Sequence, residues 1–308
     1  MMKRLLRRLL NRSARTPREG PSIHPLWKSF LDHSRPYITG NGIASRCRHV
    51  WNYDGYRVNQ ALSNNRVFVK TDYVDQFFAN VRLDEPFVLF THNSDYPVDR
   101  SLARHLDDPR LLLWFAQNAD VRHPKLRSIP IGIANAGYSH GDIEVIDRVR
   151  EEHHVRSQLF YANFNVHNNR AEREYCLRQT RLRLRDEVDG GWNEFAGGYK
   201  LPTSFEGYLR DLRRTLFCIS PKGNGIDCHR TWEALYMGCI PVVTRSEVAE
   251  AHRNMPIVIL EDWSEFKDRE FTAELHRSIW ADFDVSELYL ENYWRRIDRE
   301  IERSMNHP

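Results

Sequence analysis

Short apolar runs alternate with longer segments of helical spacing along most of the chain. In the first half, the apolar runs lie at 66–70, 86–91, 111–116 and 129–133. In the second half, they lie at 158–164, 215–219, 240–243 and 257–260. Buried strands that alternate with helices are typical of parallel α/β sheets, so we predict one such sheet in each half. The stretch from 21 to 55 lacks this pattern, and we expect short helices and loops there.

The two series of runs also predict how the chain divides. We expect a basic tail at 1–20, a first domain at 21–140, a linker helix at 141–157, a second domain at 158–280 and a C-terminal helix at 281–308. The stretch from Gly137 to Gly141 interrupts the pattern at the predicted domain boundary.

The stretch from Ser220 to Val243 is the most informative part of the sequence. It follows the apolar run at 215–219. Three residues that break regular structure come first: Pro221, Gly223 and Gly225. We expect Asp227 to cap a helix over 228–237, and a strand follows at 240–243. The unit is a βαβ crossover, and ligands of such sheets bind beyond the carboxyl ends of the strands.

The polar residues of this predicted helix suggest its chemistry. Arg230 lies in the first turn beside the glycine loop, where an anion such as a phosphate is favoured. Glu233 lies on the same face one turn deeper and could accept hydrogen bonds from sugar hydroxyls. Lys222 would add a positive charge from the loop. The alternative is an internal Arg230–Glu233 ion pair, with the glycines serving only the turn.

The same stretch resembles the donor-binding segment of exostosin-like glycosyltransferases. The likeness rests on Arg-x-x-Glu-Ala followed by Gly-Cys-Ile-Pro-Val-Val. The matching residues are Arg230, Glu233, Ala234, Gly238, Cys239, Ile240, Pro241, Val242 and Val243. Cys228 stands where the family usually has Ser, and Asp227 and His229 also mark a variant subgroup.

This resemblance implies the GT-B fold, in which two Rossmann-like parallel-sheet domains face a cleft and the C-terminal helices return to the first domain. It implies a nucleotide-diphosphate sugar donor, inversion at the anomeric carbon and no obligatory metal. The Arg is expected near the diphosphate and the Glu near donor hydroxyls. The predicted donor-binding residues of this stretch are Lys222, Gly223, Asn224, Gly225, Asp227, His229, Arg230 and Glu233.

Two more arginines are predicted to reach the donor. Arg170 and Arg173 begin a helix that follows the first strand of the second domain. The helix dipole disfavours positive charge at that end, so a bound anion would explain them. The alternative is that they pair with Glu172 and Glu174 or are simply exposed.

A second polar cluster follows the strand at 86–91 in the first domain. His92, Asn93 and Asp95 lie where an open α/β sheet places its site. Asp95 or His92 could be the catalytic base that removes a proton from an acceptor hydroxyl. Asn118 and Asn135 follow the next two predicted strands, and with Asn93 they are expected to line the acceptor side of the cleft. The alternative for Asn93 and Asp95 is that they form an Asx-turn and a helix cap.

Composition narrows the partners. The chain of 308 residues has 45 basic and 42 acidic residues, a net charge of +3, which is too balanced for a broad nucleic-acid surface. Its 5 cysteines are scattered, which favours a reducing compartment, and no metal-binding spacing is present. Residues 1–18 carry seven Lys or Arg and no acid. They are either an amphipathic helix on an anionic membrane surface or a solvated tail.

The sequence therefore predicts a cytoplasmic glycosyltransferase, peripheral at the membrane if the tail binds lipid. It would move a sugar from a nucleotide diphosphate to a hydroxyl of a glycan or glycolipid, in surface or lipid-linked polysaccharide synthesis, without a further cofactor. Three alternatives stay open: a nucleotide-sugar epimerase of similar architecture, a non-catalytic glycan- or nucleotide-binding module, and a protein that binds nucleic acid or a lipid surface through the basic stretch at 1–18.

Overall fold

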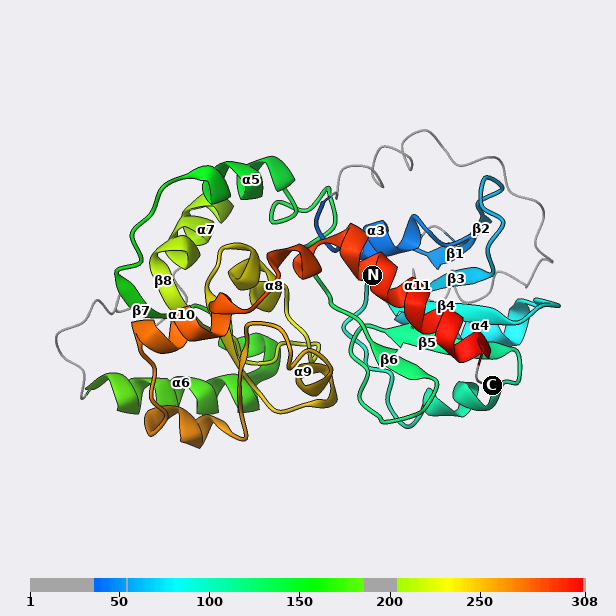
Figure 1. The fold of residues 1–308 in the computed structure, drawn as a ribbon. Coiled ribbons are helices and arrows are strands. Elements are labelled where there is room, and N and C mark those ends of the chain that lie inside the picture. Colours follow the sequence, from blue (N-terminus) through cyan, green and yellow to red (C-terminus); the bar gives the residue numbers. More distant parts are fainter. Residues whose placement is uncertain (1–35, 54, 186–203, 307–308) are drawn as a thin grey trace, which may run out of the picture.

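The protein is built around two separate sheets that lie side by side (Figure 1). The computed structural model describes residues 36–53, 55–185 and 204–306. The predicted basic tail at 1–20, the membrane-binding hypothesis for 1–18 and the start of the first predicted domain lie outside these residues.

The first sheet has six strands in the order β2-β1-β3-β4-β5-β6, and only the β1–β2 pair is antiparallel. The strands are β1 (His49–Asn52), β2 (Gly55–Val58), β3 (Arg66–Lys70), β4 (Phe87–His92), β5 (Leu111–Ala116) and β6 (Leu126–Ser128). Two short helices accompany them, α3 (Gly40–Ala44) and α4 (Val74–Asn80). Every residue of β4 is buried, as its continuous apolar run predicts for a central parallel strand.

Two sequence predictions about this sheet are wrong. The hairpin of β1 and β2 falls within and just after the stretch for which only helices and loops were expected. The last strand, β6, ends at Ser128, whereas the apolar run predicted a strand at 129–133. Beyond β6, the backbone N–H groups of Ile131 and Ile133 donate to other partners, the carboxylate of Asp227 and the carbonyl of Ile38. Pro130, directly before Ile131, has no N–H to donate to a neighbouring strand.

The second sheet has four parallel strands in the order β10-β9-β8-β7. The strands are β7 (Gln158–Tyr161), β8 (Thr215–Ile219), β9 (Ile240–Thr244) and β10 (Val258–Leu260). Its helices are α5 (Ile143–Glu151), α6 (Arg170–Arg185), α7 (Phe205–Arg214), α8 (His229–Tyr236), α9 (Glu247–Ala251) and α10 (Ala273–Ala281). The strand–loop–helix–strand unit predicted from 215 to 243 is confirmed as β8, α8 and β9.

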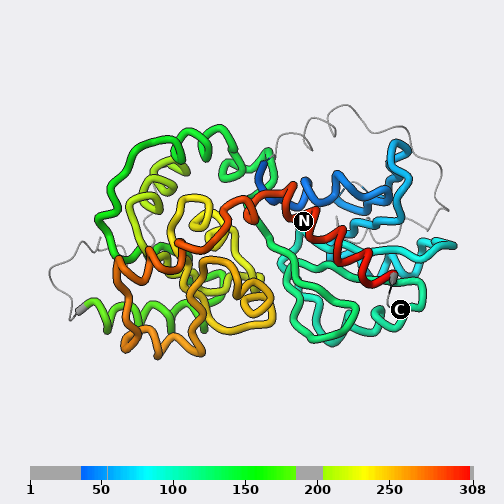
Figure 2. The backbone as a smooth tube through the Cα atoms, viewed as in Figure 1, coloured from blue at the N-terminus to red at the C-terminus, as the bar shows by residue number. Residues whose placement is uncertain are grey.

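The last helix, α11 (Leu290–Asn306), packs on the first sheet although the chain reaches it from the second (Figure 2). Its Trp294 ring lies 5.2 Å from that of Phe90 in β4. Its Asp298 accepts a hydrogen bond of 2.6 Å from Arg66 in β3. The apolar stripe of this helix therefore covers one face of β3, β4 and β5. Among the described helices, none is long and apolar enough to cross a membrane.

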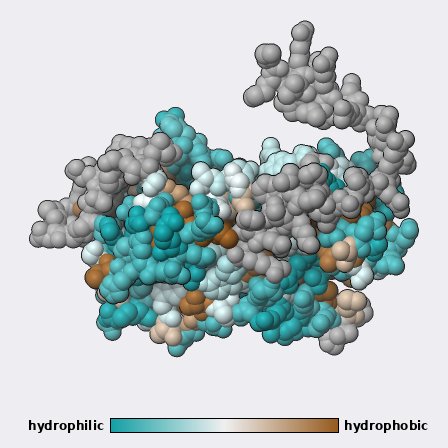
Figure 3. Space-filling view, turned by 90° about the horizontal axis from the view of Figure 1, so that it is seen from above, coloured by the Kyte–Doolittle hydropathy of each residue, from teal (hydrophilic) through white to brown (hydrophobic). Residues whose placement is uncertain are grey.

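An apolar cluster joins the two units. Tyr37 and Ile131 of the first unit pack with Trp232 and Tyr236 of α8 in one buried group. Arg122 and Glu247 form an ion pair of 2.7 Å across the same boundary. On the face shown in Figure 3, the visible hydrophobic residues are scattered among hydrophilic ones. The two sheets are therefore held against each other, and the site lies where their carboxyl ends meet.

Candidate functional site

Two adjoining cavities lie between the sheets. One has a volume of about 560 Å³ and is lined by Tyr53, Tyr96 and Tyr138, and we call it the tyrosine cavity. The other has a volume of about 540 Å³ and is lined by Arg173 and Arg230, and we call it the arginine cavity. Both are lined by the same five residues where they meet: Asp95, Ile131, His140, Asn224 and His229. A single ligand or two reacting ligands could therefore span them.

The arginine cavity contains two guanidiniums that no carboxylate neutralises by an ion pair among the described residues. Arg173 is 3% exposed and donates to the carbonyls of Asn165 at 2.6 Å and Lys222 at 2.8 Å. The Nη1 atom of Arg230 is buried and has no hydrogen-bond partner among the described residues. Both guanidiniums lie over the ring of Phe164, at 5.9 and 5.7 Å from its centroid. Two partly desolvated positive charges with unused donors form a site for an anion.

Glu233 lies deeper in the same cavity and does not pair with Arg230. Its Oε2 atom accepts a hydrogen bond of 2.7 Å from the hydroxyl of Tyr208 in α7. Burial raises the pKa of Glu233 to about 7. The alternative, a simple Arg230–Glu233 ion pair, is not found among the ion pairs of the described residues, although the charge of Arg230 lowers the pKa of Glu233 against the larger effect of burial. The carboxyl group is therefore near its titration midpoint at neutral pH.

The glycines of the loop make room for side chains of the site. A Cβ atom on Gly223 would lie 2.8 Å from Nη2 of Arg173. A Cβ atom on Gly225 would lie 2.7 Å from Nδ2 of Asn118 in the first unit. Glycines in such a loop can let the backbone approach a ligand. In the structure they let Arg173 and Asn118 approach the loop.

Asp227 joins the two units and does not cap α8. The N-cap residue of α8 is Cys228, without a side-chain cap. The carboxylate of Asp227 accepts from the backbone N–H of Ile131 at 2.8 Å and from Nε1 of Trp232 at 2.8 Å. Burial raises the pKa of Asp227 to about 6. Although Asp227 lies at the wall of the arginine cavity, these hydrogen bonds make it a structural link.

Asn118 is part of the same link. It is fully buried, and its backbone has a φ of 57°, the left-handed region that Asn tolerates better than most residues. Its Oδ1 atom accepts a hydrogen bond of 2.8 Å from the backbone N–H of Asp227. Asn118 lines neither cavity, so its expected place on the acceptor side of the cleft is wrong.

Two predicted donor-binding cations also lie away from the arginine cavity. Arg170 is exposed and forms an ion pair of 2.7 Å with Glu174, which is the alternative left open for it. The Nζ atom of Lys222 lies 3.5 Å from the carbonyl of Arg245, and its side chain is not part of the cavity wall. Of the four cations predicted to bind the nucleotide-sugar donor, only Arg173 and Arg230 therefore line the arginine cavity in the described structure.

His92 is buried in the tyrosine cavity with both ring nitrogens engaged. Its Nδ1 atom accepts from the backbone N–H of Asn93 at 2.7 Å, and its Nε2 atom lies 3.1 Å from the carbonyl of Pro130. These partners define the neutral tautomer with the proton on Nε2, and burial lowers the pKa of His92 to about 4. This geometry leaves no free lone pair for proton abstraction, so it argues against His92 as the base.

Asp95 is exposed at the junction of the two cavities. Its Oδ2 atom lies 3.4 Å from Nδ2 of Asn224, which belongs to the glycine loop of the other unit. Asn93 and Asn135 lie nearby in the wall of the tyrosine cavity, where Nδ2 of Asn135 donates to Oδ1 of Asn93 at 2.8 Å. With His92, four of the residues predicted after the strands of the first domain are thus brought together around this cavity.

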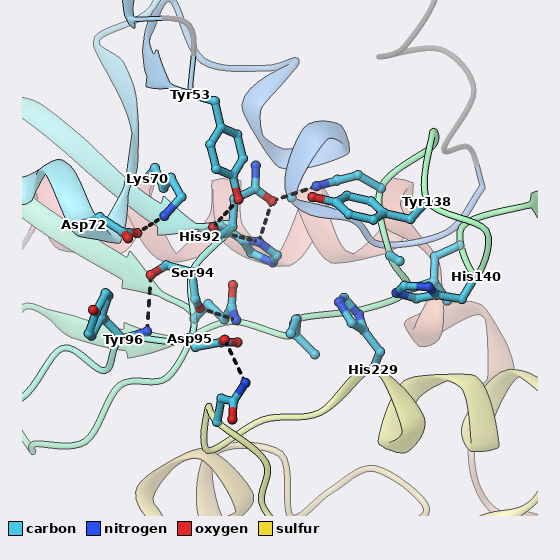
Figure 4. Close-up of a pocket in the computed structure, with 18 of the residues that line it drawn as sticks. Tyr53, Lys70, Asp72, His92, Ser94, Asp95, Tyr96, Tyr138, His140 and His229 are labelled. Atoms are coloured by element: carbon cyan, nitrogen blue, oxygen red, sulfur yellow. Dashed lines mark hydrogen bonds and ion pairs between the residues drawn. The ribbon is translucent and has the colours of Figure 1, made fainter. Parts of the chain in front are cut away.

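His229 is a further acceptor at the junction. Its Nδ1 atom donates to the carbonyl of Gly132 across the two units at 2.8 Å, which leaves the lone pair of Nε2 without a hydrogen-bond partner. Burial lowers the pKa of His229 to about 4, so the ring is neutral at pH 7. His140 lies beside it, with ring centroids 6.0 Å apart (Figure 4).

Several residues that line the two cavities were not predicted from the sequence. They are Tyr53, Lys70, Asp72, Tyr96, Tyr138, His140, Phe164 and Tyr208. The spacing of apolar residues in α7 indicates that Tyr208 faces inward, but it does not indicate the hydrogen bond to Glu233. Tyr53, Tyr96 and Tyr138 come from three separate loops, so no local spacing in the sequence links them.

Comparisons with known proteins add no constraint beyond this geometry. No family model matches the chain, and no curated protein matches it. In the residues that the structure describes, no group of three or more His, Cys, Asp or Glu side chains is arranged to hold a metal ion. The interpretation therefore depends on the two cavities and the residues that line them.

Proposed function

We propose that this protein is a glycosyltransferase of the GT-B type, similar to the exostosin-like enzymes, that uses a nucleotide-diphosphate sugar. The observation that carries the proposal is the pair of guanidiniums, Arg173 and Arg230, which have no carboxylate ion-pair partner among the described residues. They lie beside the N-terminus of α8, which itself favours negative charge. A diphosphate supplies the negative charge that this site lacks.

The proposed reaction uses both cavities. A hydroxyl oxygen of the acceptor attacks the anomeric carbon of the donor, and the bond from that carbon to the distal phosphate oxygen breaks. The proton of the hydroxyl passes to Asp95, and the bonding electrons leave with the nucleoside diphosphate. Arg173 and Arg230 stabilise the charge that develops on the leaving group. Glu233 accepts hydrogen bonds from hydroxyls of the donor sugar.

Asp95 is the better of the two predicted bases on geometric grounds. It is exposed at the junction of the cavities, whereas both ring nitrogens of His92 are already engaged. His229 offers a further lone pair at this junction, on its Nε2 atom. We propose that Nε2 of His229 accepts a hydrogen bond from the reacting hydroxyl of the acceptor and thereby orients it.

A thermal-shift screen tests the donor site directly. UDP, GDP and CMP are added to the full chain, and a ligand present at about 100 times its dissociation constant raises stability by about 2.7 kcal/mol. We expect a shift with one nucleoside diphosphate that is lost in Arg230→Ala and in Arg173→Ala. The matched control is Arg178→Ala, which removes an exposed arginine from α6 outside both cavities.

The outcomes separate the proposal from its alternatives. A folded protein that shifts with none of the nucleotides would overturn the donor site. A shift that survives both arginine variants would place the nucleotide elsewhere. Turnover of the donor alone into an isomer would indicate an epimerase, and binding without transfer to any acceptor would indicate a binding module.

A further inference from the structure

The tyrosine cavity gathers the most exposed aromatic rings of the part of the chain that the structure describes. Tyr53, Tyr96 and Tyr138 are 63%, 64% and 54% exposed. The other large hydrophobic side chains with comparable exposure in the described residues are aliphatic or Met: Val155, Leu182, Val285 and Met305. All three tyrosines line the same cavity, although they come from three different loops (Figure 4). Aromatic rings left in water around one cavity are typical of a surface that stacks on a ligand.

The polar groups of this cavity suit hydroxyls. Asn93, Asn135, Ser94 and Asp95 line it, and amide, hydroxyl and carboxylate groups between them offer both donors and acceptors. The hydroxyl of Tyr53 donates to the carbonyl of Asn93 at 3.2 Å, which fixes one ring over the polar floor. Apolar ring faces beside such groups match a sugar, which has C–H groups on its faces and hydroxyls at its edge.

The charge of the cavity excludes an anionic ligand. Lys70 supplies the one lysine or arginine cation among the described lining residues. It is 7% exposed and forms an ion pair with Asp72, and its Nζ atom lies 5.0 Å from the ring centroid of Tyr53. Burial lowers the pKa of His92 and of His229 to about 4, so these rings are neutral at pH 7. A carboxylate, sulfate or phosphate would find no free positive charge and would face Asp95.

The two cavities therefore divide by charge. Guanidiniums line the arginine cavity, and none lines the tyrosine cavity in the described structure. A volume of about 560 Å³ lies within the range of small-molecule sites and leaves room for about two sugar rings.

We propose that the tyrosine cavity binds an uncharged saccharide, the end of a neutral glycan chain, by stacking on Tyr53, Tyr96 and Tyr138. Its role as the acceptor rests on the proposed function, because the cavity meets the donor side at Asp95 and His229. The saccharide class itself rests on the cavity alone.

Saturation-transfer difference NMR on the full chain tests the saccharide class. One mixture contains methyl glycosides of neutral hexoses and pentoses together with short neutral oligosaccharides. The second contains methyl hexuronosides and hexose phosphates. We expect saturation transfer to neutral glycosides and little to the anionic set. In Tyr96→Ala and Tyr138→Ala we expect binding about fivefold to tenfold weaker.

The control variant is Tyr175→Ala. Tyr175 on α6 is also a partly exposed tyrosine, but it donates to Asp262 and lines neither cavity. Equal or stronger transfer to the anionic set would overturn the inference. So would no transfer to any neutral glycoside, or transfer that both cavity variants leave unchanged.

The nucleotide screen on the same samples separates this inference from the proposed function. A nucleotide shift without a glycoside signal would overturn the neutral-saccharide site and leave the donor site standing. A glycoside signal without any nucleotide shift would support the saccharide site and overturn the transferase.

Discussion

The Oδ1 atom of Asn118 accepts a hydrogen bond of 2.8 Å from the backbone N–H of Asp227, 109 positions later in the sequence. The bond joins the carboxyl end of β5 to the residue that precedes the N-cap of α8. Asp227 returns the contact by accepting from the N–H of Ile131 in the first unit. Two buried polar residues, one from each unit, therefore fix the two sides of the cleft against each other.

This link predicts a loss of stability when Asn118 is replaced. Asn118→Ala leaves the buried N–H of Asp227 without an acceptor and puts Ala at a φ of 57°. We expect a loss of about 2–4 kcal/mol in the free energy of unfolding. Asn118→Gly loses the same bond without the backbone strain and should lose about 1 kcal/mol less. Chemical denaturation of both variants measures the difference, and equal losses would show that the φ angle carries no strain.

Substitutions of the two loop glycines are expected to affect different properties, ligand binding for Gly223 and stability for Gly225. Gly223→Ala places a Cβ atom against Arg173, so we expect weaker nucleoside diphosphate binding, about tenfold or more, with little change in stability. Gly225→Ala presses on the buried Asn118, so we expect a lower melting temperature in the absence of ligand. Titration calorimetry and thermal melts on both variants provide the comparison. Equal effects on binding and stability in the two variants would contradict this assignment.

Glu233 predicts a pH dependence of stability. Its folded pKa is raised by burial to about 7, above the ordinary value of 4.5. The stabilising effect of this raised pKa is present below pH 4.5 and is lost as the pH rises through 7. Glu233→Gln does not titrate, and Tyr208 can still donate to its amide oxygen. We therefore expect the variant to gain stability relative to the parent between pH 5 and pH 8, by about 2 kcal/mol.

Thermal melts of parent and variant across that pH range measure this gain. The contribution of other titrating groups cancels in the difference between the two proteins. A difference in melting temperature that does not change with pH would show that Glu233 keeps an ordinary pKa in the fold.

Substitutions of Asp95 and His229 are expected to lower the rate of sugar transfer by different amounts. Asp95→Asn removes the proposed base, and we expect transfer to fall by about 10²–10⁴ while nucleotide binding is unchanged. His229→Gln keeps an acceptor at the junction but changes its position, so we expect a smaller loss of about tenfold. The rates are measured with the donor that the nucleotide screen identifies. A larger loss in His229→Gln than in Asp95→Asn would assign the base to His229.

The architecture of the second sheet was predictable because its signals are local. The apolar runs before and after α8, the loop breakers between them and Arg230 at the start of the helix all lie within one short stretch. The amphipathic spacing of α7 also put Tyr208 on the face that reaches Glu233. Such elements can be predicted locally because their apolar runs, loop breakers and helical spacing lie within the elements themselves.

The predictions that were wrong concern residues whose contacts are with residues distant in the sequence. The run at 129–133 has the composition of a strand, yet Ile131 donates to Asp227 and Ile133 to Ile38. Arg170 and Arg173 share a helical face in the sequence, but Arg173 reaches the loop of β8 and Arg170 pairs with Glu174. No spacing rule distinguishes two arginines one turn apart when the deciding partner lies about 50 residues away.

The position of α11 bears on how the chain folds during synthesis. The helix covers the face of the first sheet that contains Phe90, and it is translated after every strand of both sheets. The second sheet uses one continuous segment and can close as soon as that segment has left the ribosome. The first sheet, although translated earlier, keeps an apolar face uncovered until α11 emerges. The half of the molecule that is made first is therefore the half that finishes last, and it is the half that a chaperone would have to shield.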